Sequence, residues 1–155
     1  MRIDIGIDPD SIAHGAAIAI DRKLTDLKCM TLFDIVSYIN SIPLDADIRF
    51  HIEDVSKQKA VFSDKASALR KTRGDMSRKY GEVGRKVGLV QQAQAELVRF
   101  LKSMDRPIKI HLYPISSAWK KPEAGKVYMQ RVWGYTGRSN EDTRSAAYFL
   151  SLGCR

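Results

Sequence analysis

Two carboxylates stand where a reacting centre could be built. Asp8 ends an alternating run of isoleucines and polar residues at 3–8, and Glu53 ends a second alternating run at 48–53. Alternation with a period of two is typical of a strand with one buried face. If the two strands are parallel neighbours, these acids lie close together at strand ends, where α/β folds place their chemistry. Like charges at that distance repel unless a proton or a cation lies between them.

A third carboxylate, Asp142, lies on a predicted helix over about 140–152 and shares a face with apolar Ala146. A carboxylate in an apolar row is costly without a partner. Two interpretations stay open at this point. Asp142 either binds a ligand or closes a capping box in which Ser139 is the N-cap. Its neighbour Glu141 is interpreted as a first-turn acid that the helix dipole favours.

Hard oxygen ligands of this kind suit Mg²⁺, with Mn²⁺ as the alternative, and both ions also bind substrate phosphates. Two such ions about 3.5–4 Å apart can activate a water and stabilise the leaving oxygen of a phosphodiester. Asp8, Glu53 and Asp142 are therefore predicted as catalytic residues and as metal ligands of a site with two ions. The ordinary alternative for each of them alone is a solvated acid at the end of an element.

The charge balance favours a polyanionic partner. The 155 residues contain 26 Lys and Arg against 18 Asp and Glu, which gives a net charge of +8. Nucleic acid and an anionic membrane surface both fit this excess. The membrane is the weaker alternative, because no amphipathic helix pairs a basic face with bulky aromatic residues. An acidic centre in a basic protein fits a nuclease whose surface holds the phosphate backbone.

Most predicted DNA contacts fall in a basic stretch between about 56 and 104, although a solvated face is the ordinary interpretation of a charge run. Phe62 is favoured over Tyr80, Trp119, Trp133 and Tyr135 as an aromatic wedge that stacks on unpaired bases. Lys120 and Lys121 are candidates to hold a phosphate near the metals. The predicted DNA-binding residues are Lys57, Lys59, Phe62, Arg70, Lys71, Arg73, Arg78, Lys79, Arg85, Lys86, Lys120 and Lys121.

Apolar periodicity predicts the elements that must position these residues. Strands are expected at about 3–8, 14–20, 23–30, 48–53 and 108–112, and helices at about 32–39, 82–104 and 140–152. This order predicts one α/β domain over residues 1–155, with a five-stranded mixed sheet flanked by helices. The long helix is expected to bury Val83, Val87, Val90, Ala93 or Gln94, Leu97 and Leu101.

The two cysteines, Cys29 and Cys154, are far apart and form no metal-binding or redox motif. The first residues lack a secretory signal, and no apolar run reaches the roughly 20 residues that span a bilayer. These features predict a reduced protein of the cytoplasm.

The motifs, taken in chain order, resemble those of RuvC-type Holliday junction resolvases, which have a ribonuclease H-like fold. The run from Ile5 to Ser11 resembles the first motif of the family, and His51 to Val55 resembles the strand that carries its second acid. Further resemblance lies in the start of a central helix, in a segment after the fifth strand, and in the final catalytic helix, at 83–90, 113–120 and 140–147. The resemblance extends over nearly the whole chain.

This resemblance implies a homodimeric, Mg²⁺- or Mn²⁺-dependent endonuclease that nicks two opposed strands of a four-way DNA junction, leaving a 5′-phosphate and a 3′-hydroxyl. Asp8, Glu53 and Asp142 match three of the four catalytic acids of the family, and the fourth position falls on Ser145. Glu141 or Asp10 could supply the missing carboxylate, although Asp10 is also a good turn residue. The small size resembles phage or prophage members.

Two other functions remain open from the sequence. Ser145 in the place of an acid makes a catalytically impaired protein that binds branched DNA the first alternative. The second is a ribonuclease H-like nuclease that acts on flaps or on RNA-containing substrates. Junction preference and dimerisation would separate the resolvase from this second alternative.

Overall fold

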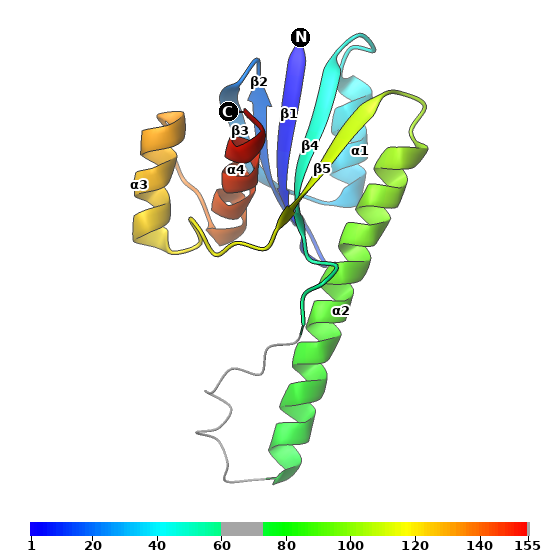
Figure 1. Cartoon of the computed structure of the whole chain (residues 1–155), viewed down its shortest axis with the longest axis vertical. Coiled ribbons are helices and arrows are strands. Elements are labelled where there is room, and N and C mark those ends of the chain that lie inside the picture. Colours follow the sequence, from blue (N-terminus) through cyan, green and yellow to red (C-terminus); the bar gives the residue numbers. More distant parts are fainter. Residues whose placement is uncertain (60–72, 155) are drawn as a thin grey trace.

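The structure is a computed structural model that describes residues 1–59 and 73–154, with the side chains of the long helix described from residue 81 onward. Figure 1 shows its described strands and helices in chain order. They are β1 (Arg2–Asp8), β2 (His14–Ile20), β3 (Lys23–Met30), α1 (Leu32–Ser41), β4 (Asp47–Asp54), α2 (Arg73–Ser103), β5 (Ile108–Pro114), α3 (Pro122–Trp133) and α4 (Glu141–Cys154).

The five strands form one mixed sheet in the order β3-β2-β1-β4-β5, with β1 at its centre. The pairs β1–β2 and β2–β3 are antiparallel, whereas β4 is parallel to both β1 and β5. A tight turn joins β2 to β3, where Asp21 and Arg22 adopt positive φ angles of 47° and 67°. Such angles match the twist of a two-residue hairpin. The predicted five-stranded mixed sheet is confirmed.

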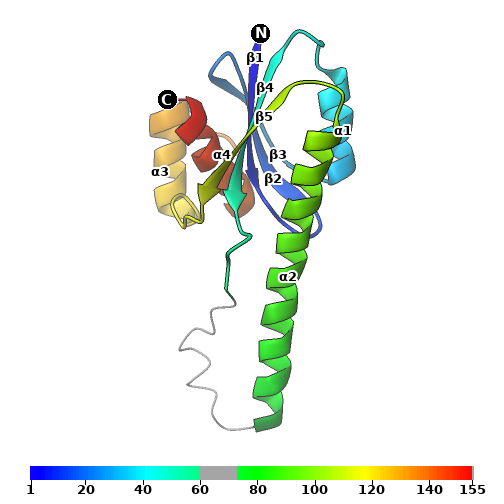
Figure 2. The ribbon, with the colours of Figure 1, turned by 45° about the vertical axis from the view of Figure 1, so that its right-hand side comes forward.

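One face of the sheet carries the main apolar core beneath α1 and α2 (Figure 2). Alternate residues of β1 and β4 point to this side, and Ile5, Ile48 and Phe50 are at most 1% exposed. The helices contribute Ile39 of α1 and Leu97 of α2, which are fully buried. Burial of aliphatic side chains contributes about 1.5–3 kcal/mol each, so this layer fixes the strands that carry Asp8 and Glu53.

The opposite face is built from small residues, so the backbone of α4 lies directly on the sheet. Ala17 and Ala19 of β2 pack against Ala146 and Ala147 of α4. A Cβ atom at Gly6 of β1 would lie 2.1 Å from the carbonyl oxygen of Ala146. Only glycine fits such a gap. This close approach brings the first turn of α4 to the ends of β1 and β2.

Two helices differ from the sequence prediction. The helix α3 was absent from the sequence prediction, although Pro122 occupies one of its first positions and Gly134 caps its end with a φ of 62°. Both are known boundary signals. The helix α2 starts at Arg73 rather than near residue 82 and extends past the sheet (Figure 1). Its predicted buried face is therefore confirmed at Leu97, whereas Val83 is 38% exposed. None of the described helices is long and apolar enough to cross a membrane.

The glycine contact predicts a stability difference between two substitutions. Gly6→Ala should lower the free energy of unfolding by about 1–3 kcal/mol, because the new methyl group forces α4 away from the sheet. Gly88→Ala in α2 meets nothing within 4 Å and should be neutral or stabilising by up to about 1 kcal/mol, because alanine favours a helix. Urea denaturation of both variants measures the difference. Equal stabilities would contradict the tight packing of α4.

Candidate active site

Asp8 and Glu53 lie side by side at the ends of β1 and β4. The parallel register pairs Ile7 with Ile52, so the next residue of each strand is an acid at the same edge of the sheet. Both carboxyl groups are buried, with exposed fractions of 7% for Asp8 and 2% for Glu53. The condition on which the sequence argument depended, that the two strands are parallel neighbours, is therefore met.

The Asp8 carboxyl group holds its proton unusually tightly. Burial raises its pKa to about 8, and the neighbouring Glu53 carboxylate adds to this rise. The ammonium group of Lys120 and the hydroxyl group of Ser145 act in the opposite direction. One acid with a perturbed pKa in a buried pair is typical of functional sites.

The segment that follows β5 holds the Glu53 side chain in place. The backbone N–H of Ser116 donates a hydrogen bond of 3.1 Å to Glu53 Oε1. Lys120 Nζ lies 3.9 Å from Glu53 Oε2, and the Lys120 side chain is 30% exposed. The lysine therefore joins the buried acids to the surface. This position agrees with the prediction that Lys120 could hold a phosphate beside the carboxylates.

Asp142 occupies the first turn of α4 and has no role in its cap. The N-cap is Asn140, whose Oδ1 accepts a hydrogen bond of 2.8 Å from the N–H of Thr143. Thr143 Oγ1 in turn accepts one of 3.0 Å from the N–H of Asn140. The interpretation with Ser139 as N-cap and Asp142 as its partner is therefore wrong, because the next residue takes the cap position.

The Asp142 carboxylate is half-buried near the paired acids. A Cβ atom built on Gly15 would lie 2.7 Å from Asp142 Cβ, and Gly15 is the register partner of Asp8 in the sheet. Burial raises the pKa of Asp142, and the negative charges of Asp10 and Glu141 raise it further. A carboxylate without a cap partner, placed among other acids, is a reasonable cation ligand.

The two additional acids differ in position. Asp10 forms the predicted turn, because its Oδ1 accepts a hydrogen bond of 2.9 Å from the N–H of Ile12. Its charge nevertheless reaches Asp142. Glu141 is exposed in the first turn of α4, where the helix dipole favours an acid.

Ser145 stands at the centre of the cluster. Its side chain is fully buried, and its Oγ atom lacks a hydrogen-bond partner within the described residues. The hydroxyl group lies close enough to Asp8 to lower the pKa of that acid. The helix α4 thus presents residue 145 to Asp8, and the side chain at this position affects the pKa of that acid. An unsatisfied buried hydroxyl costs about 1–3 kcal/mol.

The donor set fits a hard divalent cation in its chemistry. All donors are oxygens, and the buried pair of Asp8 and Glu53 needs a proton or a cation between its members. Among the described side chains of residues 1–59 and 81–154, however, no three acidic, histidine or cysteine side chains converge closely enough to enclose an ion. The arrangement is a close pair with Asp142 beside it.

The predicted DNA-binding residues are only partly described. Lys57, Lys59, Arg85, Lys86 and Lys121 are exposed, as phosphate contacts must be. Phe62, Arg70 and Lys71 lie outside the described residues, and the side chains of Arg73, Arg78 and Lys79 do as well.

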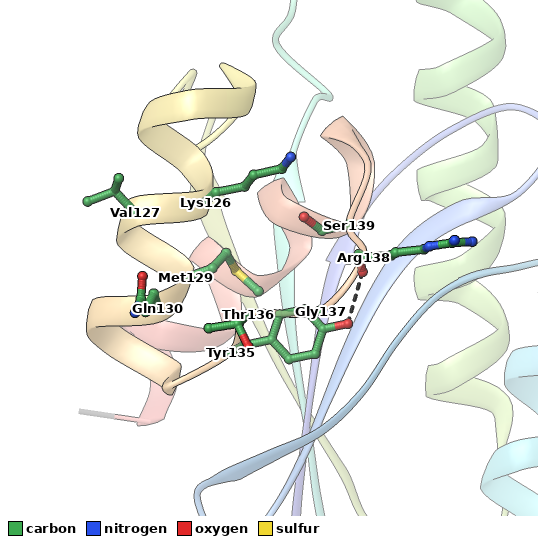
Figure 3. A pocket seen from close by; sticks show the side chains of 9 residues that line it. All are labelled: Lys126, Val127, Met129, Gln130, Tyr135, Thr136, Gly137, Arg138 and Ser139. Carbon is green, nitrogen blue, oxygen red and sulfur yellow. Dashed lines mark hydrogen bonds between the residues drawn. The ribbon is translucent and has the colours of Figure 1, made fainter.

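Three of the aromatic candidates have partners inside the protein. Trp119 is 5% exposed and stacks on Tyr128, with 5.8 Å between ring centroids. It is therefore no stacking platform for DNA. Trp133 donates a hydrogen bond of 3.2 Å to the carbonyl of Ala147. Tyr135 lines a hollow of about 670 Å³ between α3 and the segment before α4 and donates to the carbonyl of Arg138 (Figure 3).

The histidine on the Glu53 strand face is part of the core. His51 Nε2 lies 2.9 Å from Asp4 Oδ1, and its Nδ1 lies 3.1 Å from the hydroxyl of Tyr113. The ring is 2% exposed. Both ring nitrogens contact Tyr113 and Asp4 and not Glu53, so His51 is a packed strand histidine.

Sequence reasoning missed two groups that hold the site together. One is the backbone N–H of Ser116, which carries no sequence signal. The other is Arg144, which is 3% exposed and contacts the segment that bears Lys120. Its signal was available, since a charged residue between the small residues of a helix that packs on a sheet must find a buried partner.

Comparison with known proteins identifies the fold. No family model matches the sequence, and neither does any curated protein. A solved structure of "T. thermophilus RuvC in complex with Holliday junction substrate" matches with a TM-score of 0.52 at 12% identity, over 99% of this chain and 94% of that chain. Another Thermus thermophilus RuvC structure matches with a TM-score of 0.47 at 11% identity, over 98% and 93% of the two chains. The chain has a RuvC-like, ribonuclease H-like fold.

The buried acid pair predicts how stability depends on pH. The pKa of Asp8 is about 8 in the folded protein, against 3.8 for an unperturbed aspartate side chain. The folded state therefore binds more protons between these values, and the free energy of unfolding should fall as pH rises from about 4 to about 8. Asp8→Asn should remove most of this fall. Thermal melts of the metal-free protein across this range measure it, and parallel curves for the two proteins would contradict the pairing.

Proposed function

We propose that the protein is a Mg²⁺- or Mn²⁺-dependent endonuclease that resolves four-way DNA junctions by paired symmetric nicks, leaving 5′-phosphates and 3′-hydroxyls. The observation that carries this proposal is the buried pair of Asp8 and Glu53 at the ends of parallel strands, with a lysine beside it. The solved RuvC whose fold the chain shares was bound to a Holliday junction. The net charge of +8 fits the same class of partner.

In this proposal Asp8 and Glu53 hold the metal, and Asp142 completes its ligands from α4. The bound ions would activate a water and stabilise the leaving oxygen of the phosphodiester. The chain supplies the rest of the chemistry. The N–H of Ser116 holds Glu53 in place. The Lys120 ammonium group stands at the exposed side of the pair, where it can bind a phosphate oxygen and orient the scissile bond.

The substrate would be held by phosphate contacts around this centre. Lys57 and Lys59 lie in the segment after β4, four and six residues beyond Glu53, and Lys121 is next to Lys120; all three are exposed. A homodimer would present two equivalent sites to two equivalent phosphates of a junction, because a twofold protein matches a near-symmetric substrate. If six phosphates are neutralised, log affinity falls with log salt with a slope of about −5.

One observation favours a second function. Ser145 is buried at the acid pair without a hydrogen-bond partner in the described part of the chain. A protein that has lost one acid at this position could bind branched DNA without cutting it.

The first experiment compares an immobile four-way junction with linear duplex of the same sequence, each incubated with EDTA, Mg²⁺ or Mn²⁺. We expect paired symmetric nicks on the junction only with metal. Asp8→Asn should abolish nicking, by at least about 100-fold, and leave junction binding within about twofold, because it removes a metal ligand and no phosphate contact. Asp45→Asn, an exposed acid in the connection before β4, is the matched control and should cut normally.

Each other outcome of this assay is informative. Binding without nicks under any metal would favour the impaired DNA-binding protein. Cutting of flaps or RNA-containing duplexes in preference to the junction would assign another substrate to the same site. Wild-type cutting by Asp8→Asn would contradict the site itself.

The position of Ser145 predicts the effect of restoring an acid. Ser145→Asp should keep or raise metal-dependent nicking, because the new carboxylate would reach the ion from the helix face that already points at Asp8. It should also lower the melting temperature of the metal-free protein at pH 8, since a further acid joins a buried pair. Ser145→Ala is the control without a charge. A folded Ser145→Asp protein that cuts nothing, beside an active wild type, would contradict this role.

A further inference from the structure

Arg144 is a buried arginine without an acidic partner. The residue is 3% exposed, and in the described part of the chain it forms no ion pair, although its positive charge lowers the pKa of Asp142. It donates instead to three backbone carbonyls. The bonds run to Trp119 at 3.1 Å, to Lys120 at 2.9 Å and to Ser139 at 3.0 Å. Burying a guanidinium group is costly. These three hydrogen bonds must therefore hold segments of the backbone whose position matters to the fold.

The three carbonyls belong to the two segments that approach the acid pair from outside the sheet. Trp119 and Lys120 lie in the connection after β5, and Lys120 reaches Glu53. Ser139 lies just before α4, whose first turn carries Asp142. One side chain therefore ties the lysine segment to the start of the acid-bearing helix.

The lysine segment needs such a tie because its backbone is strained. Trp119 has a φ of 68°, a left-handed conformation that costs a residue other than glycine about 1–3 kcal/mol. The Trp119 carbonyl is also tightly packed against α3. A Cβ atom at Gly125 would lie 2.2 Å from the Trp119 carbonyl and 2.8 Å from Arg144 Cδ. The carbonyl of the strained residue Trp119 is thus held between α3 and the guanidinium group of Arg144.

We propose that Arg144 is a positioning residue of the nuclease site. Its three hydrogen bonds fix the backbone of Lys120, and so keep the Lys120 ammonium group beside Glu53 and fixed relative to the start of the helix that carries Asp142. This inference rests on the proposed function for its effect on catalysis. Its effect on the geometry of the site does not depend on any substrate.

The chain contains a matched control for this role. Arg106 also donates to three backbone carbonyls, those of Ile39 at 2.8 Å, Ile42 at 3.2 Å and Pro43 at 2.7 Å. These carbonyls end α1 and start the connection to β4, at the opposite end of the sheet from Asp8. A lysine at either position keeps the charge but cannot form the planar fork. Arg144→Lys and Arg106→Lys therefore lose similar backbone contacts at different distances from the site.

The first measurement is nicking at saturating junction, together with junction affinity and thermal melting. Both variants should melt at lower temperature than the wild type. Arg144→Lys should lower kcat by about tenfold or more, because small displacements of a positioned group carry large rate effects, and should leave the dissociation constant within about twofold. Arg106→Lys should keep kcat within about twofold. Gly125→Ala, which displaces the Trp119 carbonyl while Arg144 is retained, should behave like Arg144→Lys.

A double-variant cycle tests whether the arginine acts through the lysine. If it does, the kcat of the double variant Lys120→Gln/Arg144→Lys should lie within about twofold of the kcat of Lys120→Gln alone. The effects of coupled residues on the free energy are not additive, so removing the arginine costs little once the lysine is gone. Fully multiplicative losses, or equal kcat values for Arg144→Lys and Arg106→Lys, would overturn the proposal.

A spectroscopic measurement separates this inference from the proposed function. The side-chain carboxyl ¹³C resonance of Glu53, recorded without metal or DNA, should move in the same direction in Arg144→Lys and in Lys120→Gln, and should stay in place in Arg106→Lys. If no form of the protein cuts DNA but this pattern is found, the nuclease proposal fails and the positioning role stands. If the wild type cuts and Arg144→Lys leaves the Glu53 resonance unchanged, the positioning role fails alone.

Discussion

The structure depends on keeping two carboxyl groups together in a place that water barely reaches. Asp8 and Glu53 are 7% and 2% exposed, and a pair of like charges at such a site is unstable unless a proton or a cation lies between them. Burial, together with the neighbouring Glu53, raises the pKa of Asp8 to about 8, so below that pH the metal-free protein meets this constraint with a proton. A divalent cation would meet it with more charge and would leave both oxygens as ligands.

The remaining architecture serves this constraint. Parallel pairing of β1 with β4 is what places the two acids at one edge, and parallel strands need long connections covered by helices. One layer of helices buries the isoleucine face. The other layer rests on glycine and alanine, so that α4 comes close enough for Ser145 to touch Asp8. A larger residue at Gly6 or Gly15 would separate the helix from the acids.

The sequence predicted the parts of this arrangement that repeat with a regular period. The alternation of apolar and polar residues located β1 and β4, and it placed Asp8 and Glu53 near their ends. Prediction failed at the start of α4, because Asn140 and Ser139 are both good caps and the packing of the helix decides between them. The sequence named Lys120 only as a candidate to hold a phosphate and did not predict its approach to Glu53, which lies beside the hydrogen bonds that Arg144 donates to this segment. Contacts between irregular segments that are distant in sequence leave no periodic trace.

The charges around the acid pair also explain why a serine can stand beside it. Each acid added to a buried cluster raises the cost of the metal-free state, and Lys120 is the cation close enough to Asp8 to lower its pKa. With Ser145 neutral, these acids face two cations, since both Lys120 and Arg144 lower the pKa of the half-buried Asp142. A fourth carboxylate would bind a divalent ion more strongly but would leave the metal-free site with a larger uncompensated charge. In the proposed nuclease, the serine would therefore favour a stable metal-free fold at the expense of affinity for the ion.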